Sequence, residues 1–246
     1  MAANQLAQTV RQQLGIGRVL PLGGPADGAW ITEQAATEVL RTAVGSRTGV
    51  RVGTLRLSVA EPDDAPEPAV PAPPSALPPG PLRIEADFAA VADRPLPAIA
   101  DGLRAALLTA SDRELGLVVS TVDLRVSGLL EADEAGEAAV SPPTPATPTA
   151  DRTPTVAPDG RTGSTQASPE GAAAAALAVP GVARLAPALG GLSRPVRLAE
   201  GHALIQLATT AGHRTLDVTG AVRAAVTAAL PAPLTVAVLV TAVERG

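Results

Sequence analysis

Two histidines are the side chains in this sequence best suited to proton transfer or metal binding. His202 and His213 stand about eleven residues apart, on either side of one predicted strand, and the chain contains no cysteine. A zinc site needs three or four ligands that converge on one point. The pair alone therefore predicts two solvated residues at the ends of a strand, and no metal site.

A hydrolase is the enzyme class that these residues suggest. His213 and Asp217 have the side chains of a general base and the carboxylate that orients it. No G-x-S-x-G turn is present to supply a nucleophile. We therefore expect a protein that is not an enzyme, and we keep a hydrolase using His213 as an alternative.

Two glycine pairs near the N-terminus, Gly15-x-Gly17 and Gly23-Gly24, resemble fragments of a phosphate-binding loop. All 19 basic residues of the chain are arginine, so the lysine of a P-loop is missing. No strand precedes Gly15 in the βαβ context that such loops require. We predict no cofactor.

Charge and aromatic content argue against binding to nucleic acid. The net charge is −5, and Trp30 and Phe88 are the sole aromatic residues. A nucleic-acid site needs clustered positive charge, and single strands stack on aromatic rings. We expect no nucleic-acid partner. A nucleic-acid-binding module is kept as an alternative because small αββαβ units occur among RNA-binding folds.

The sequence patterns predict a cytoplasmic protein. The first ten residues lack the charged and apolar regions of a signal peptide. No run approaches the roughly 18 apolar residues of a spanning helix, so no direct membrane span is predicted. The absence of cysteine fits a reducing compartment.

The stretch 96–129 organises the rest of the chain, because it predicts one amphipathic helix followed by one alternating strand. A stripe of apolar residues at helical spacing marks the helix, and apolar residues alternate with Asp123, Arg125 and Ser127 in the strand. Upstream, Thr32 is a predicted helix N-cap, and two further strands are predicted within 50–59 and 82–88. The helix stripe consists of Leu96, Ile99, Leu103 and Leu107.

Two proline-rich segments divide the chain. The segment 62–81 holds nine prolines in twenty residues, and 131–169 holds seven. Such density excludes helices and internal strands, so we expect 61–81 to be an extended, mobile insertion and 131–169 a disordered linker. The predicted domains are an N-terminal arm (1–28), a first block (29–130) and a second block (170–246).

The second block repeats the order of the first: helix, strand, strand, helix, strand. Shifting the first block by 119 residues brings Arg104 onto Arg223 and Phe88 onto Leu207. We therefore predict an α+β fold made of two copies of this unit, each a small three-stranded sheet with helices packed on one face. Because domains of this size are marginally stable alone, we also expect the two blocks to pack against each other.

The segment GLVVSTVDLRVSGLL (116–130) resembles the alkaline shock protein family of envelope stress response proteins from Gram-positive bacteria. Those domains end in a glycine, a valine-rich strand and an alternating tail, and they carry a VxGVA-type segment, similar to 179–183 here. The resemblance covers about 29–130 and 172–244 and implies an internally duplicated, diverged member. The first block lacks the VPGVA segment, and duplication departs from the usual family arrangement.

Residues and resemblance together predict a non-catalytic cytoplasmic interaction or scaffold protein. Arg104 and Arg223 take matching exposed positions on two predicted helices, which makes them candidate partner contacts. The resemblance implies a protein partner, either a small membrane-anchored protein or a second copy, and hence a peripheral location at the membrane through that partner.

Overall fold

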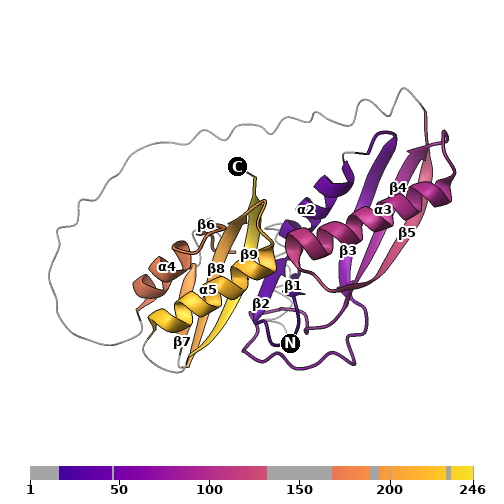
Figure 1. The fold of residues 1–246 in the computed structure, drawn as a ribbon. Coiled ribbons are helices and arrows are strands. Elements are labelled where there is room, and N and C mark those ends of the chain that lie inside the picture. Colours follow the sequence, from indigo (N-terminus) through magenta and orange to yellow (C-terminus); the bar gives the residue numbers. More distant parts are fainter. Residues whose placement is uncertain are drawn as a thin grey trace.

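The computed structural model describes residues 17–45, 47–131, 168–188, 194–199, 201–230 and 234–245. Within these ranges the chain forms a mixed α+β fold with four α-helices, one π-helical turn and two β-sheets (Figure 1). One sheet has six strands and the other has three. The predicted α+β class is therefore confirmed.

The three-stranded sheet joins an antiparallel pair to a third strand that runs parallel to the middle one. Apolar and polar residues alternate in the middle strand, where Ile84 and Phe88 are buried while Arg83 and Glu85 are exposed. One face of the sheet is thus packed and the other is solvated. The elements of this first unit are α2 (Glu33–Gly45), β3 (Val50–Val59), β4 (Leu82–Val91), α3 (Leu96–Ala110), η1 (Ser111–Leu115) and β5 (Val119–Leu130).

Local chemistry explains where the two helices of this unit begin. The Oγ1 of Thr32 accepts a hydrogen bond from the Ala35 amide at 3.3 Å, so the predicted N-cap of α2 is confirmed. In α3, Pro97 lies in the first turn, where its missing N–H leaves no hydrogen bond unmade.

The second unit has the same order of elements, except that two short strands replace the first long one. Ser168 caps its first helix, because the Oγ accepts the Gly171 amide at 3.0 Å. Both short strands pair antiparallel with the next strand, β8, and the last strand runs parallel to β8. The elements are α4 (Pro169–Leu177), β6 (Val182–Leu185), β7 (Val196–Ala199), β8 (His202–Thr210), α5 (Thr215–Ala229) and β9 (Thr235–Glu244).

A hairpin near the start of the described chain corrects the predicted architecture. Its strands, β1 (Val19–Leu22) and β2 (Ala29–Thr32), are antiparallel, and β2 adds to β9 in parallel, with Ile31 opposite Val240. The second sheet thus has six strands in the order β1-β2-β9-β8-β6, with β7 also on β8. The prediction of three strands there is wrong. The hairpin adds two strands and satisfies the edge of β9, and β6 adds a third because it pairs with β8 beyond the end of β7.

The proline-rich insertion is also packed, where the sequence suggested a mobile spacer. Its Ala69 amide donates to the Pro25 carbonyl at 2.9 Å, and its Leu77 amide donates to the Val19 carbonyl at 2.8 Å. Val70 is buried in a small cluster with Trp30 on the outer face of the six-stranded sheet. Proline lowers the entropy cost of ordering such a segment, so a few apolar anchors hold it, and this sheet is covered on both faces.

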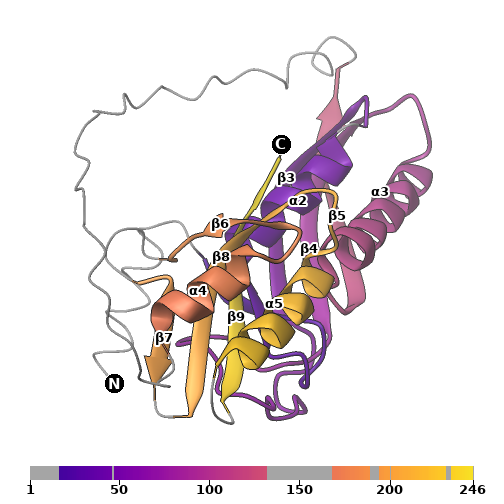
Figure 2. The same ribbon diagram turned by 60° about the vertical axis from the view of Figure 1, so that its left-hand side comes forward.

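One continuous apolar core runs through both units, so the expectation that the two blocks pack against each other is confirmed. Turning the molecule shows the two sheets next to each other, with α4 and α5 over one and α3 over the other (Figure 2). The core draws residues from the hairpin, from all four helices and from both sheets, among them Leu20, Leu40, Phe88, Leu107, Ala172, Val222 and Val240. The predicted disordered linker, 131–169, falls mostly on 132–167, outside the described residues.

Candidate interaction site at the sheet edges

The two arginines predicted as partner contacts occupy corresponding places. The Nε of Arg104, in α3, donates to the Val122 carbonyl on β5 at 3.4 Å. The Nε of Arg223, in α5, donates to the Val236 carbonyl on β9 at 3.0 Å. Each arginine therefore ties a helix to the outer side of the last strand of its own unit.

Arg223 also holds the hairpin in place. Its Nη1 donates to the Ala26 carbonyl at 3.1 Å and to the Asp27 carbonyl. Next to this contact, the Val238 amide donates to the Gly28 carbonyl at 3.0 Å, which begins the pairing of the hairpin with β9. The guanidinium of Arg223 thus binds main-chain oxygens of the segment that occupies the edge of β9, and its hydrogen bonds lie within the chain.

The corresponding edge of β5 is open. Within the described residues β5 pairs with β4 alone. The Nη1 of Arg104, which corresponds to the hairpin-binding nitrogen of Arg223, donates instead to the Asp101 carboxylate at 2.7 Å. That ion pair is exposed, with 41% and 76% of the two side chains accessible. Arg104 therefore lies beside an unoccupied strand position.

Exposed apolar side chains gather around this open edge. Leu108 of α3 is 39% exposed, and Val126 and Leu129 of β5 are 43% and 63% exposed. Val118, immediately before β5, is 49% exposed. The described part of the chain has five exposed large apolar side chains, and these are four of them. The fifth, Leu177, lies in α4. Such clustering is typical of an interaction surface.

The solvated face of the three-stranded sheet carries charges of both signs. Arg83 of β4 forms an ion pair with Asp123 of β5 at 3.3 Å. In the strand register, Asp87 stands opposite Arg125, and Glu85 stands opposite Asp123. Exposed pairs of this kind contribute little to stability, but they determine which charges a strand added at β5 would meet.

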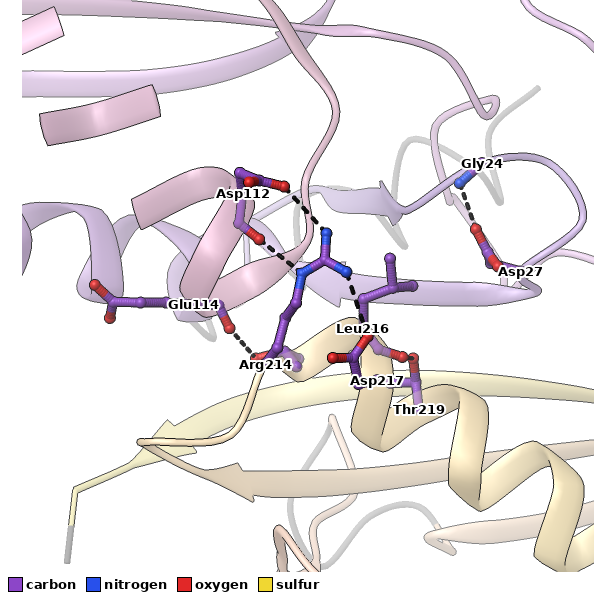
Figure 3. Close-up of polar contacts among 9 residues, drawn as sticks. Gly24, Asp27, Asp112, Glu114, Arg214, Leu216, Asp217 and Thr219 are labelled. Atoms are coloured by element: carbon purple, nitrogen blue, oxygen red, sulfur yellow. Dashed lines mark hydrogen bonds and ion pairs between the residues drawn. The ribbon is translucent and has the colours of Figure 1, made fainter. Parts of the chain in front are cut away.

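The two units are joined by polar contacts between η1 and the start of α5 (Figure 3). Arg214 donates through Nε to the Asp112 carbonyl at 2.8 Å and through Nη2 to the Asp112 carboxylate at 3.1 Å. The Oγ1 of Thr215 donates to the Glu114 carbonyl at 3.2 Å. These bonds hold the end of α3 against α5 and so contribute to the placement of the β5 edge relative to the second unit.

Leu216 completes this junction by packing against two glycines. A Cβ on Gly116, whose φ is +85°, would overlap the Leu216 side chain, and a Cβ on Gly23 would come within 2.8 Å of its Cδ1. Only glycine fits both the left-handed backbone and this close approach.

Glu33 is the acidic group most strongly engaged by its surroundings. Its carboxylate accepts hydrogen bonds from the Arg18 guanidinium at 3.2 Å and from the Leu57 amide at 3.4 Å. Burial alone would raise the pKa of Glu33, but these hydrogen bonds and the Arg18 charge outweigh it and lower the pKa. Glu33 lines an open hollow of about 1060 Å³ between α2 and β3.

The histidines lie at opposite ends of β8, as predicted. The Nδ1 of His202 lies 2.8 Å from the Thr235 Oγ1, and burial lowers the pKa of His202 although the Thr235 hydrogen bond opposes this. The Nδ1 of His213 lies 3.3 Å from the Thr210 Oγ1, whereas Asp217 pairs with Arg214. The structure thus gives each member of the suggested base–orienter pair a different partner.

No group of three or more potential metal ligands converges in the described ranges.

The feature that sequence reasoning missed is the hairpin. Two four-residue apolar segments, 19–22 and 29–32, flank a six-residue turn that contains Gly23-Gly24. The glycines mark the turn, but the connection is longer than the two to five residues that signal a hairpin in a sequence. The helix cap predicted at Thr32 is the last residue of the second segment, which forms a strand before the helix begins.

Comparison with protein-family models, with curated proteins and with solved structures found no match. Within the part of the chain that the structure describes, no helix combines the length and the apolar character needed to cross a bilayer.

Proposed function

We propose that this protein is a non-catalytic interaction protein that binds a protein partner at the open edge of β5 by strand addition. The observation that carries this proposal is the difference between two corresponding edges. The edge of β9 is filled by β2 and held by Arg223, whereas the edge of β5 pairs with no described strand and has Arg104 beside it. Strand addition satisfies the main-chain groups of an open edge and gives affinity through its hydrogen bonds.

We further propose that the two units are copies of one ancestral unit. Val122 and Val236 stand opposite Ile84 and Ala203, which the 119-residue shift also aligns. Both parallel ladders shift register at the same place, after Phe88 and after Leu207. Arg104 and Arg223 are 119 residues apart whereas Val122 and Val236 are 114 apart. The difference of five equals the length of η1, so one inserted turn accounts for it.

The chemistry around β5 defines the partner segment. An added strand would place alternate side chains toward α3, where Leu108 and Val126 offer apolar contacts. The remaining side chains would face Asp123 and Arg125 on the solvated side. The partner segment is therefore extended, with apolar and polar residues in alternation.

The resemblance of residues 116–130 to envelope stress response proteins supports a cytoplasmic scaffold of that type. On this proposal the partner is a small membrane-anchored protein or a second copy, and the protein is located at the membrane through it. A hydrolase using His213 gains no support, since His213 and Asp217 bond to different residues.

Site-specific photo-crosslinking in the native cell tests the proposal. A photoreactive residue replaces Ser127, which is exposed on β5, and in a matched variant it replaces Thr54, which is exposed on β3 at the opposite edge of the same sheet. We expect a discrete adduct from position 127 and none from position 54. Mass spectrometry of the adduct identifies the bound segment.

An adduct of equal yield from both positions, or no adduct from position 127, would contradict the proposal. A variant carrying Val126→Lys provides a further check, because a charge on the apolar side of the edge should abolish the adduct at position 127. Circular dichroism of that variant shows whether the fold is retained.

A further inference from the structure

The sheet edges in the described ranges differ in how strongly they are protected against strand pairing. β3 has a register shift between Val52 and Leu55 and exposes Arg51 and Arg56, two charges of the same sign. Bulges and like charges are common protections of edge strands.

The edges of the six-stranded sheet are protected in other ways. In β1, Pro21 offers no amide hydrogen, and the Val19 carbonyl is taken by the Leu77 amide of the insertion. On the opposite side, β6 and β7 are only four residues long. β5, in contrast, has twelve residues, no proline, and one acidic and one basic side chain. β5 has two register shifts of its own, but the six residues between them, 121–126, pair with β4 without interruption and carry no two charges of the same sign. It is therefore the least protected of these edges.

The regular part of β5 is self-complementary. It lies between two register shifts, so that residues 121–126 pair with β4 without interruption. Val122, Leu124 and Val126 stand opposite Ile84, Ala86 and Phe88 on the packed face, whereas Asp123 and Arg125 lie on the solvated face. The two charges are placed symmetrically about Leu124 and are opposite in sign.

The main-chain groups of Leu124 face the open edge. In the second unit, the Val238 amide donates outward to the Gly28 carbonyl of the hairpin. Val238 lies two residues after Val236, as Leu124 lies two residues after Val122, and the two arginine contacts make Val122 and Val236 correspond. The amide and carbonyl of Leu124 are therefore available to a neighbouring strand.

We infer that the occupant of this edge is a second copy of the chain, whose β5 pairs antiparallel with this β5 about a two-fold axis at Leu124. This register places Asp123 opposite the partner's Arg125, and Arg125 opposite the partner's Asp123. It also places Val122 opposite the partner's Val126 on the packed side. The contact is isologous, since the same patch serves both copies, and the two three-stranded sheets become one sheet of six strands.

Charge complementarity favours this occupant. In this register the main-chain groups of residues 122, 124 and 126 form the hydrogen bonds to the partner. Asp123 and the partner's Arg125 then form a non-hydrogen-bonded pair, in which the side chains lie closest. Asp123 otherwise pairs with Arg83 alone, in an exposed contact. A shift of this antiparallel register by two residues would place Asp123 opposite the partner's Asp123, or Arg125 opposite the partner's Arg125. A shift by one residue would turn the valines of one copy away from the packed face.

The same arrangement covers the apolar side chains at the edge. Val126 and Leu129 stand opposite buried Phe88 and Ala90 and so lie on the packed face, although both remain exposed in one copy. Leu108 projects from α3 on the same side as Arg104, one turn further along. Two copies of α3 would meet across the axis above these residues.

This inference rests on the proposed function and names the occupant of the same edge. It is tested by sedimentation velocity of the full chain over a wide range of concentrations. Asp123→Arg places two arginines opposite each other, and Arg125→Asp places two aspartates opposite each other. We expect a dimer for the unmodified chain and dimers weakened about tenfold for each variant, because two cross-strand pairs change from attraction to repulsion.

Mixing the two variants gives the decisive result. In the mixed dimer every arginine faces an aspartate, so the mixture should dimerise as tightly as the unmodified chain, and so should the double variant Asp123→Arg/Arg125→Asp. Arg56→Asp is the matched control, since it makes the same charge change on the same face but on β3, and it should leave the dimer unchanged. Thermal melts confirm that each variant folds.

A chain that is monomeric at all concentrations overturns the inference, and so does a dimer that neither charge reversal weakens. If the chain is monomeric while position 127 crosslinks to a segment of another protein, the second copy is rejected and the proposed function stands. If the chain dimerises but the charge variants have no effect and position 127 yields no adduct, both are rejected.

Discussion

The six-stranded sheet and the three-stranded sheet share a parallel pair of strands joined by a helix, but side chains on the six-stranded sheet are more fully buried. In β8 every residue from Ala203 to Thr209 is buried, because helices lie on one face and the proline-rich insertion lies against the other. In β5 only Val122 and Leu130 are buried. The edge of β9 is filled by the hairpin, whereas no strand of the described ranges lies at the outer edge of β5.

The residue types of the two strands β8 and β5 account for this contrast. β8 is a nearly continuous apolar run, which is typical of a strand covered on both faces, whereas β5 alternates apolar and polar residues. Gln206 and Thr209 are its buried polar residues, and the side chain of Gln206 is satisfied by the Ala188 amide at 2.9 Å and the Arg194 carbonyl at 3.2 Å. The second unit is therefore the closed one, and the first unit keeps an accessible surface.

The largest expected effect is the difference between a carboxylate placed on β2, which fills the edge of β9, and a carboxylate placed on β5. Ile31→Asp should lower the free energy of unfolding by on the order of 4 kcal/mol or more, because Ile31 is fully buried in β2 and an unpaired buried charge is costly. Val126→Asp on β5 should cost less than about 1 kcal/mol. Urea unfolding of both variants measures the difference, and equal losses would remove the distinction between a closed and an open edge.

The junction between the units gives the next largest effect. Gly116→Ala should cost about 3 kcal/mol, since the new Cβ meets Leu216 in a left-handed backbone conformation. Gly212→Ala is the matched control, because its φ is also positive, at +92°, but its Cβ would meet nothing within 4 Å. It should cost about 1 kcal/mol from the backbone alone. Similar losses for the two variants would show that Leu216 does not constrain the junction.

The two arginines should differ despite their corresponding positions. Arg223→Met should lower the free energy of unfolding by about 2 kcal/mol, because three main-chain carbonyls lose a charged donor. Arg104→Met should cost about 0.5 kcal/mol or less, since its ion pair is exposed. Thermal or urea unfolding measures both. A larger loss of stability in Arg104→Met than in Arg223→Met would contradict the role of Arg223 in holding the hairpin.

The cover on the outer face of the six-stranded sheet can be tested through Val70. Val70→Ala should cost about 1.5 kcal/mol, because two buried carbons are removed. It should also change the fluorescence of Trp30, the single tryptophan, which belongs to the same cluster. Glu67→Ala, at an exposed position of the same insertion, should change neither quantity. An unaltered Trp30 signal in Val70→Ala would indicate that the insertion does not pack there.

The smallest effect is expected from pH. The lowered pKa of Glu33 means that the folded state binds this proton less readily than the unfolded state does. The stability contributed by Glu33 is therefore fully present above pH 4.5, the usual value for glutamate, and is lost as the pH falls through the lowered pKa. Glu33→Gln should make the acid side of a plot of stability against pH less steep. An identical acid limb in both proteins would show that Arg18 does not stabilise the carboxylate.

Local sequence was enough to predict most of the first unit. Helical spacing of Leu103 and its neighbours gave α3, the hydroxyl of Thr32 gave the start of α2, and alternation gave β4 and β5. Each of these signals depends on residues within one or two turns, or on one strand, so no distant partner has to be known. The corresponding placement of Arg104 and Arg223 followed from aligning the two halves.

The α+β class, the order of elements within the first unit and three of the four residues that α3 buries could be predicted without a structure. Three further features depend on contacts between distant segments: 29–32 belongs to the sheet of β9, Val70 anchors a proline-rich cover, and β5 has one neighbouring strand among the described residues. The physical reason is that a four-residue apolar segment has no periodicity that names its neighbour. Its pairing depends on which distant edge would otherwise be left with unsatisfied main-chain groups, and β9 lies about 200 residues away in the chain.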